Sequence, residues 1–411
     1  MGDQQYLPRV ASRLLERATA ASPVVVLMGA RQTGKSTLVQ SEPFLDDRLY
    51  LTLDDLGVRE RARMSPDDLV RSAERIILDE VQREPDVLLA VKRAVDEDRP
   101  RKNGRFVLTG SANLLLMHRV SESLAGRATY VNLWPLTRQE RMGHGCAGIW
   151  TEFFSAPVSN WPELVASRPT VPASWQDEVR RGGYPTPAME LPSDDACALW
   201  FDGYLRTYLE RDLQTVAAIS NLVDFRRLMR VTCLRLGTVV NQAGLGRDTQ
   251  VPRATVQRYL NLLEASFQLV RVEAYALSRT KRLVKSPKLY WSDPGLALWL
   301  GGAGTASGAH LENLVLSDLL VWRDSQIPAP EVLFWRTATD LEVDFVLETR
   351  GGLLPVEVKA ATSPGFADTR GLRAFREEYR DQFVGGLLLH GGNQTQWMSD
   401  EILAVPWWRV L

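Results

Sequence analysis

The sequence has few cysteines, few histidines and no long apolar run. Its 411 residues include three cysteines, widely spaced and without a CxxC pair, which argues against a disulfide framework and against a cysteine zinc site. The four histidines are scattered, so a histidine-based metal site is not expected either. No segment approaches the roughly 18 consecutive apolar residues of a membrane-spanning helix, and we therefore expect no contact with a membrane.

The N-terminus also lacks the basic start and apolar core of a secretory signal, so we expect a cytoplasmic protein with reduced thiols. Hydrophobic residues make up 45% of the chain and charged residues 24%, as in ordinary globular proteins. A chain of this length predicts roughly two to four domains.

Charge is distributed unevenly, although the net charge is only −1. Residues 226–288 contain 13 Lys and Arg against three acids, whereas residues 311–411 contain nine Lys and Arg against 15 acids. A basic middle followed by an acidic tail points to nucleic acid as a partner.

The first segment alternates apolar, β-branched runs with helical patterns. Such alternation predicts an α/β domain with a five-stranded parallel sheet. Residues 141–190 are interrupted by prolines and predict an irregular connection with short helices, before helix resumes around 195–216. The five runs lie at residues 23–28, 49–53, 75–79, 105–109 and 129–133.

A glycine-rich loop directly follows the first predicted strand. Residues 29–36 fit the pattern GxxxxGK[ST], in which glycines turn backbone N–H groups toward phosphates. Lys35 is expected to meet the β- and γ-phosphates and Ser36 to hold Mg²⁺. The cofactors predicted are therefore ATP and Mg²⁺. The candidate ATP-binding residues are Gly29, Gln32, Thr33, Gly34, Lys35, Ser36, Thr37, Ser111 and Arg127.

An acidic pair ends the third predicted strand. Asp79 is expected to orient the Mg²⁺ shell and Glu80 to activate the attacking water. The next strand ends in Thr109 and Ser111, either of which is a candidate γ-phosphate sensor or, alternatively, a helix N-cap.

In this order of motifs the chain resembles the AAA+ class of P-loop ATPases. More specifically, it is similar to a bacterial and archaeal group in which the ATPase is joined to a C-terminal region of unassigned role. The resemblance implies a five-stranded ATPase core, a helical lid and a DNA-linked or regulatory role. Three further stretches support it: residues 123–127, 182–185 and 208–213.

Two arginines in those stretches have alternative interpretations. Arg127 precedes the fifth strand and is a candidate for a neighbour's γ-phosphate, which predicts a homo-oligomer. It is alternatively a sensor within its own chain or a member of a surface ion pair. Arg211 is equally well a packing or interdomain ion pair or a catalytic group.

The basic middle predicts a winged helix. A helix over 239–245, a turn over 246–250 and a second helix opening at 251–255 precede two strand-like runs, and a basic tip at 278–285 resembles a wing. DNA is the expected partner, although winged helices also bind proteins. The candidate DNA-binding residues are Arg253, Arg258, Lys281 and Arg282.

The acidic C-terminal region carries a short pattern of carboxylates and a lysine. Asp344 lies in one predicted strand, and Glu357 and Lys359 share a face of the next. The pattern resembles the D…ExK motif of restriction-endonuclease-like nucleases, with Glu312 matching their helical glutamate. It implies that Asp344 and Glu357 bind a divalent metal, with Lys359 and Glu312 completing the catalytic set. The alternatives are an inactive domain that keeps the shape and a structural ion pair.

These predictions combine into one organisation of the chain. We expect a DNA-binding ATPase that couples ATP hydrolysis to DNA processing by a metal-dependent nuclease-like domain. The alternative is a nucleotide-switched DNA-binding or regulatory protein whose nuclease-like domain is not catalytic. The expected domains are an ATPase core (1–140), an irregular connection and helical lid (141–225), a winged helix (226–300), a linker (301–308) and a restriction-endonuclease-like domain (309–411).

Overall fold

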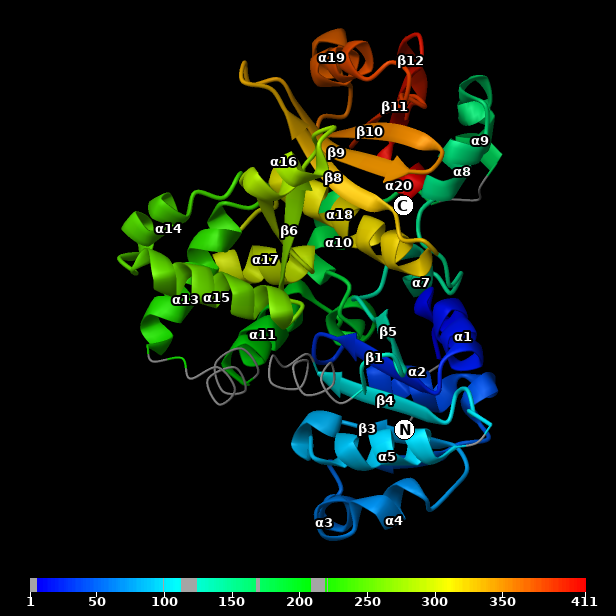
Figure 1. Cartoon of the computed structure of the whole chain (residues 1–411). Helices are drawn as coiled ribbons and strands as arrows, with labels where there is room; N and C mark the ends of the chain where they lie inside the picture. Colours follow the sequence, from blue (N-terminus) through cyan, green and yellow to red (C-terminus); the bar gives the residue numbers. More distant parts are fainter. Residues whose placement is uncertain (1–5, 99, 112–123, 168–170, 208–218, 220) are drawn as a thin grey trace.

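The computed structural model describes residues 6–98, 100–111, 124–167, 171–207, 219 and 221–411. Two sheets organise this part of the chain: a parallel sheet near the N-terminus and a mixed sheet that includes the C-terminal strands (Figure 1). Ser123 and the stretch 208–213, which includes Arg211, lie outside the described residues.

The first sheet has five parallel strands in the order β2-β3-β4-β1-β5, which confirms the predicted sheet. Strand β1 is buried on both faces because its alternate residues point to opposite helical layers. Val24 and Val26 pack with helix α5, and Val25 and Leu27 pack with α1 and α2. The strands are β1 (Val24–Gly29), β2 (Leu49–Thr52), β3 (Ile76–Asp79), β4 (Phe106–Ser111) and β5 (Ala128–Asn132). The helices are α1 (Ala11–Ala21), α2 (Lys35–Ser41), α3 (Leu56–Met64), α4 (Pro66–Val70) and α5 (Val87–Glu97).

Short helices follow, as the proline spacing predicts. A capping box at Thr137 and Glu140 starts the first of them. Buried aromatic side chains, among them Trp150, Trp161 and Tyr184, anchor this region to the core. The helices are α7 (Arg138–Arg141), α8 (Trp150–Ser155), α9 (Trp161–Ser167), α10 (Trp175–Arg181) and α11 (Asp194–Tyr204).

The basic region differs from the prediction in two places. The predicted turn at 246–250 is wrong, because Asn241 caps a helix that continues to Thr249 and turns at Gln250, whose φ is +56°. The predicted basic tip at 278–285 contains a helix over residues 279–284, although the strand-like runs on either side do pair antiparallel as β6 and β7, so the winged helix stays a prediction. The elements are α13 (Leu222–Leu234), α14 (Gln242–Thr249), α15 (Arg253–Ala265), β6 (Leu269–Ala274), α16 (Arg279–Val284), β7 (Lys288–Trp291) and α17 (Pro294–Gly301).

The second sheet has eight strands in the order β12-β13-β11-β10-β9-β8-β6-β7. Helix α18 packs on β8 and β10, and α19 packs on β9, β10 and β11. The remaining strands are β8 (Glu331–Arg336), β9 (Glu342–Thr349), β10 (Gly352–Lys359), β11 (Gly386–His390), β12 (Gln396–Ser399) and β13 (Ile402–Pro406). The remaining helices are α18 (Gly308–Ser325), α19 (Arg370–Glu378) and α20 (Trp407–Val410).

The expected linker at 301–308 does not separate two sheets. Strand β6, which precedes it, pairs in parallel with β8, which follows it. One core of buried side chains also extends from Trp134 through Tyr259 to Leu411. The basic region and the acidic C-terminal region are therefore packed together. No helix among the described residues is long and apolar enough to cross a membrane.

Candidate functional site

The phosphate loop connects β1 to α2 as the sequence predicts. Gln32 (φ +62°) and Gly34 (φ +92°) adopt left-handed conformations, which are typical of loops that gather N–H groups around an anion. A side chain at Gly29 would place its Cβ 2.2 Å from the carbonyl oxygen of Leu133, so this position requires glycine. Thr33 is buried, and its hydroxyl donates to the carbonyl of Ala30 at 2.9 Å.

Lys35 folds back over this loop. Its Nζ donates to the carbonyl oxygens of Ala30 (2.7 Å) and Gly29 (3.3 Å), and the side chain is buried. Burial lowers the pKa of the Lys35 ammonium to about 8, while Glu80 and Asp79 act in the opposite direction. A buried cation held only by carbonyl groups is well suited to receive a phosphate.

Asp79 is surrounded by hydroxyl groups. Ser36 donates to its Oδ2 at 2.9 Å, Tyr50 donates to the same oxygen at 2.6 Å, and Thr109 donates to Oδ1. Tyr50 is a site residue that the sequence analysis missed. It lies on β2, the strand beside β3, and only the sheet order reveals that neighbour.

Glu80 follows Asp79 in a left-handed conformation (φ +58°). Its backbone N–H donates to the Thr109 hydroxyl at 3.3 Å, and Gln82 donates to its carboxylate. Burial raises the pKa of Glu80, Lys35 lowers it and Asp79 raises it further. Of the two candidate sensors, Thr109 therefore contacts the acidic pair, whereas Ser111 pairs with Gly29 across the sheet.

The last two predicted nucleotide residues are Thr37 and Arg127. Thr37 is exposed on the first turn of α2. Arg127 forms a two-point ion pair with Asp96, with distances of 2.6 and 2.9 Å, and also donates to the carbonyl of Ala125. Among its interpretations, the surface ion pair is the one present in this chain, and its action on a neighbouring subunit stays a prediction.

Arg9 is a buried brace of the phosphate loop that the sequence did not indicate. Its guanidinium donates to the Thr33 carbonyl (2.9 Å), to the Trp134 carbonyl (2.7 Å) and to Glu140 (3.1 Å). These partners are up to 131 residues away in the sequence, so no local pattern marks the contact. The brace connects the loop to the start of the helical region.

A second connection leads from the phosphate loop to the basic region. The Tyr204 hydroxyl lies 3.4 Å from the carbonyl oxygen of Arg31, and Gln268 donates to the same hydroxyl at 3.1 Å. Gln268 directly precedes β6. A shift of the phosphate loop therefore has a hydrogen-bonded route to this strand.

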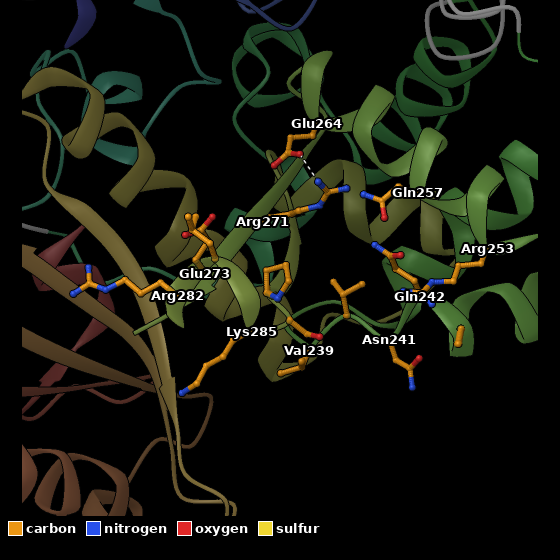
Figure 2. Close-up of a pocket in the computed structure, with 15 residues that line it drawn as sticks. Val239, Asn241, Gln242, Arg253, Gln257, Glu264, Arg271, Glu273, Arg282 and Lys285 are labelled. Atoms are coloured by element: carbon orange, nitrogen blue, oxygen red, sulfur yellow. Dashed lines mark hydrogen bonds and ion pairs between the residues drawn. The ribbon is translucent and has the colours of Figure 1, made fainter. Parts of the chain in front are cut away.

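Strand β6 borders a groove of about 940 Å³ between α15 and α16 (Figure 2). Its exposed cations are Arg253, at the start of α15, and Lys285, just after α16. Arg271 also lines the groove but is paired with Glu264 at 2.8 Å. The remaining polar lining includes Asn241, Gln242, Gln257 and Glu273.

The other predicted DNA contacts differ in exposure, and Arg282 also lines the groove. Arg258 is exposed and lies over the Tyr259 ring, and Lys281 is exposed on α16. Arg282 is buried, with 4% of its surface exposed, and pairs with Glu331 (2.6 Å) and Glu348. The prediction that Arg282 contacts DNA is therefore wrong, because both carboxylates hold its guanidinium against the C-terminal sheet.

The four predicted nuclease residues lie near one another where β9 and β10 pair. Val356 of β10 pairs with Phe345 of β9, so Asp344 and Glu357 are the next residues along the two paired strands. Lys359 donates to Glu357 Oε1 at 2.5 Å, and the Val358 N–H donates to Asp344 Oδ2 at 3.0 Å.

Glu312 reaches the same cluster from α18. It accepts a hydrogen bond from Tyr290 at 3.0 Å. Burial raises the pKa of Glu312 and of Glu357, and the charge of Asp344 raises both further.

A fifth charged residue, which was not among the predicted site residues, enters this cluster. Lys288 of β7 is buried, and its Nζ lies 3.2 Å from Asp344 Oδ1 and contacts Glu342. Burial lowers the pKa of Lys288, but Asp344, Glu312 and Glu342 outweigh that effect and hold its pKa above the ordinary value. The lysine is therefore charged.

The expected metal centre is not assembled in the described part of the chain. No group of three or more His, Cys, Asp or Glu side chains among these residues is arranged to hold a metal ion. The physical reason is that the ammonium groups of Lys288 and Lys359 already contact Asp344 and Glu357. The prediction that Asp344 and Glu357 bind a metal is wrong for this arrangement.

The phosphate loop, in contrast, fits ATP and Mg²⁺. Among the described residues, the hydrogen bonds of Lys35 go to neutral carbonyl groups, and those to the Asp79 carboxylate come from hydroxyl groups. Lys35, Ser36 and Asp79 are the residues that would hold the nucleotide and its ion.

Comparison with known families matches three segments of the chain. Residues 21–142 match a family described as an AAA domain. Residues 173–307 and 307–410 match two domains of unknown function, DUF8612 and DUF4143.

Relatives that match along most of the chain are known from bacteria. Uncharacterized proteins of Mycobacterium tuberculosis and Mycobacterium bovis are each 30% identical over 410 residues, covering 97% of this chain and 83% of the relative. An uncharacterized protein of Haemophilus influenzae is 22% identical over 409 residues, with 94% of each chain covered.

Solved structures with partial similarity include a Walker-type ATPase of Pyrococcus abyssi, with a TM-score of 0.39, 18% identity and coverage of 72% of this chain and 99% of that one. They also include the RuvB Holliday junction branch migration motor of Thermotoga maritima, with a TM-score of 0.27, 18% identity and coverage of 64% and 88%.

Proposed function

We propose, from the premise that this chain belongs to the family of its two mycobacterial relatives and carries an AAA-type P-loop ATPase domain, that it is a nucleotide-switched DNA-binding protein. The observation that carries the DNA-binding part is the groove between α15 and α16, with exposed Arg253 and Lys285 on its walls. Phosphates are recognised by such exposed cations with little regard to base sequence.

The ATPase part follows from the groups around Asp79. When Mg²⁺ is bound, it neutralises charge on the phosphates. Lys35 would contact the phosphates in place of the carbonyl oxygens of its own loop, and Ser36 and Asp79 would hold the ion. Glu80, whose pKa is raised by burial, takes the proton of the attacking water. Thr109 keeps Glu80 beside Asp79 through its two hydrogen bonds.

The switch is the route from the loop to the groove. Nucleotide binding changes the partners of the phosphate loop, and the carbonyl of Arg31 in that loop contacts Tyr204. Tyr204 in turn accepts from Gln268 at the start of β6, the strand that contributes Arg271 and Glu273 to the groove. In this proposal β6 has two positions, and nucleotide binding shifts the population of the protein toward one of them.

The C-terminal domain is proposed to be non-catalytic in this conformation, so nuclease coupling is not the preferred function. Lys288 and Lys359 provide the countercharge that a metal ion would provide. We expect the intact protein to leave plasmid and linear DNA uncut with Mg²⁺ or Mn²⁺. Metal-dependent cleavage that disappears in Asp344→Ala would restore the nuclease hypothesis.

DNA binding is tested by fluorescence anisotropy with labelled duplex and single-stranded DNA across a salt series. The double variant Arg253→Ala/Lys285→Ala should weaken binding and reduce the salt slope by about two units, one for each lost phosphate contact. The matched control is Arg13→Ala/Arg17→Ala, which removes two charges from the exposed side of α1.

Equal weakening by the control would show that only net charge matters and would contradict the groove as the site. Unchanged affinity in the groove variant would do the same. The switch is tested in the same assay with Tyr204→Phe, which should reduce the difference in DNA affinity between the nucleotide-free and ATP-bound states.

A further inference from the structure

A second groove borders α16, next to the groove between α15 and α16. It has a volume of about 500 Å³ and is lined by the segment that leads into α16, the end of β8 and the end of α19. Lys285 lines both grooves, so they meet just after the end of α16. The two grooves therefore form one long depression that extends from α15 to the end of β8.

This depression carries an excess of positive charge. Lys281 and Lys285 are exposed in the second groove, and Arg336, also exposed, pairs with Asp340 at 2.8 Å. Arg253 is exposed in the first groove. Together the two linings contain six Lys and Arg side chains against three Glu. A basic groove of this kind follows the phosphates of a nucleic-acid backbone.

Helix α16 contributes a wall to both grooves and is fixed to the C-terminal sheet. Arg282 holds the helix through ion pairs with Glu331 (2.6 Å) and Glu348. Lys281 directly precedes this buried arginine, and Lys285 follows it by three residues. Because the helix is held from below, the two lysines are presented to solvent from a fixed support.

Each groove also exposes a leucine. Leu283 lines the first groove and Leu277 the second, with 74% and 68% of their surfaces exposed. A duplex keeps its bases stacked inside, whereas the unstacked bases of a single strand have free faces that can cover an apolar side chain. Figure 2 shows Gln242 and Gln257 on the side of the first groove opposite Lys285, where their amides can reach base edges.

We propose that the two grooves are one binding track for single-stranded DNA, which passes Lys285 where they meet. Phosphates contact Arg253, Lys285 and Lys281 in turn, and bases cover Leu283 and Leu277. The inference rests on the proposed function, because it takes the first groove as the DNA-binding site. It adds the class of DNA that binds and the extension of the site onto the C-terminal domain.

The experiment measures fluorescence anisotropy of a labelled oligothymidine of about 15 nucleotides, alone or annealed to its complement, with the nucleotide-free full chain across a salt series. The wild type should bind the single strand about tenfold or more tighter than the duplex. Lys281→Ala/Arg336→Ala should weaken single-strand binding and reduce its salt slope by about 1.4 units, for two lost phosphate contacts. Arg13→Ala/Arg17→Ala, the control with the same change in net charge, should have little effect.

The apolar contact has a separate readout. Leu283→Ser should weaken single-strand binding about threefold without changing the salt slope, because a leucine releases no counterions. Equal affinity for single strand and duplex would overturn the proposal. Wild-type affinity in Lys281→Ala/Arg336→Ala, with weakened binding in Arg253→Ala/Lys285→Ala, would overturn the track and leave the first groove as the site. If both double variants bind like the wild type, the proposed function fails as well.

Discussion

The phosphate loop and the acidic cluster of the second sheet contain the same kinds of side chain but differ in how ready they are to bind a metal ion. The acidic cluster consists of Glu312, Asp344 and Glu357 with Lys288 and Lys359. Each site contains a buried aspartate and a buried lysine. In the loop, Lys35 contacts carbonyl oxygens, and the hydrogen bonds to Asp79 come from Ser36, Tyr50 and Thr109. In the cluster, Lys288 contacts Asp344 directly.

This difference in partners shows which carboxylates can bind a metal ion. Hydroxyl donors satisfy Asp79 without cancelling its charge, so exchanging one of them for Mg²⁺ costs little. An ammonium cancels the charge of Asp344, and replacing it means leaving a buried lysine unpaired. Counting carboxylates and lysines in the sequence does not distinguish these cases.

The largest expected effect is the loss of ATP turnover when Glu80 is replaced. Glu80→Gln keeps the size of the side chain and removes the base, so ATP turnover should fall by about 10²- to 10⁴-fold while ATP still binds. Phosphate release and binding of a fluorescent ATP analogue measure the two effects. Turnover equal to that of the wild type would exclude Glu80 as the base.

The two lysines should differ most clearly in stability. Lys288→Ala leaves Asp344 and Glu342 without their buried partner and should lower the free energy of unfolding by about 3–5 kcal/mol. Lys35→Ala should change the free energy of unfolding by about 1 kcal/mol or less, because Thr33 still donates to the Ala30 carbonyl. The same variant should abolish ATP turnover. Urea denaturation of both variants compares them, and similar losses would remove the contrast.

A third buried carboxylate sharpens the comparison by having backbone N–H partners. Asp293 accepts from Gly183 (2.6 Å) and Leu296 (2.7 Å), and burial raises its pKa from 3.8 to about 6. A raised carboxyl pKa contributes stability at low pH that is lost as pH rises through the folded value. Relative to Asp293→Asn, which does not titrate, the wild type should lose about 2 kcal/mol between pH 4 and pH 7.

Unfolding free energies of both proteins at several pH values provide the measurement. A difference that does not change with pH would mean that Asp293 stays ionised in the folded protein from pH 4 to pH 7. Its backbone N–H partners would then lower its pKa about as much as burial raises it.

Two tyrosines provide a smaller, matched test. Tyr50 donates to Asp79 in the loop site and Tyr290 donates to Glu312 in the cluster. Losing either hydrogen bond should cost about 1 kcal/mol. Tyr50→Phe should lower the kcat/KM of ATP hydrolysis about fivefold, whereas Tyr290→Phe should reduce stability and leave kcat/KM unchanged. A reduced kcat/KM in folded Tyr290→Phe would show that the two sites are coupled.

The smallest expected effect on stability is at the exposed pair of Arg127 and Asp96. Either Arg127→Ala or Asp96→Asn should change the free energy of unfolding by about 1 kcal/mol at most. If Arg127 also serves a neighbouring subunit, its loss should lower turnover by about 10³-fold or more, whereas Asp96→Asn should not. Equal turnover in the two variants would mean that the role of Arg127 is limited to its ion pair with Asp96.

The sequence by itself determined the parts of this protein whose residues are adjacent. The phosphate loop, the five strands and Asp79 at a strand end are written in short patterns, because backbone conformation and strand burial depend on near neighbours. The proximity of Asp344 to Glu357 was also predictable, since consecutive strands of a sheet usually pair.

Only the tertiary structure decided which charges meet. Arg282 looked like a DNA contact in a basic stretch and is instead buried against Glu331 and Glu348, 49 and 66 residues later. Lys288 enters the acidic cluster from 56 residues before Asp344, because β6 and β7 join the C-terminal sheet. Electrostatic interactions act through space and depend on burial, so the order of residues along the chain does not specify them.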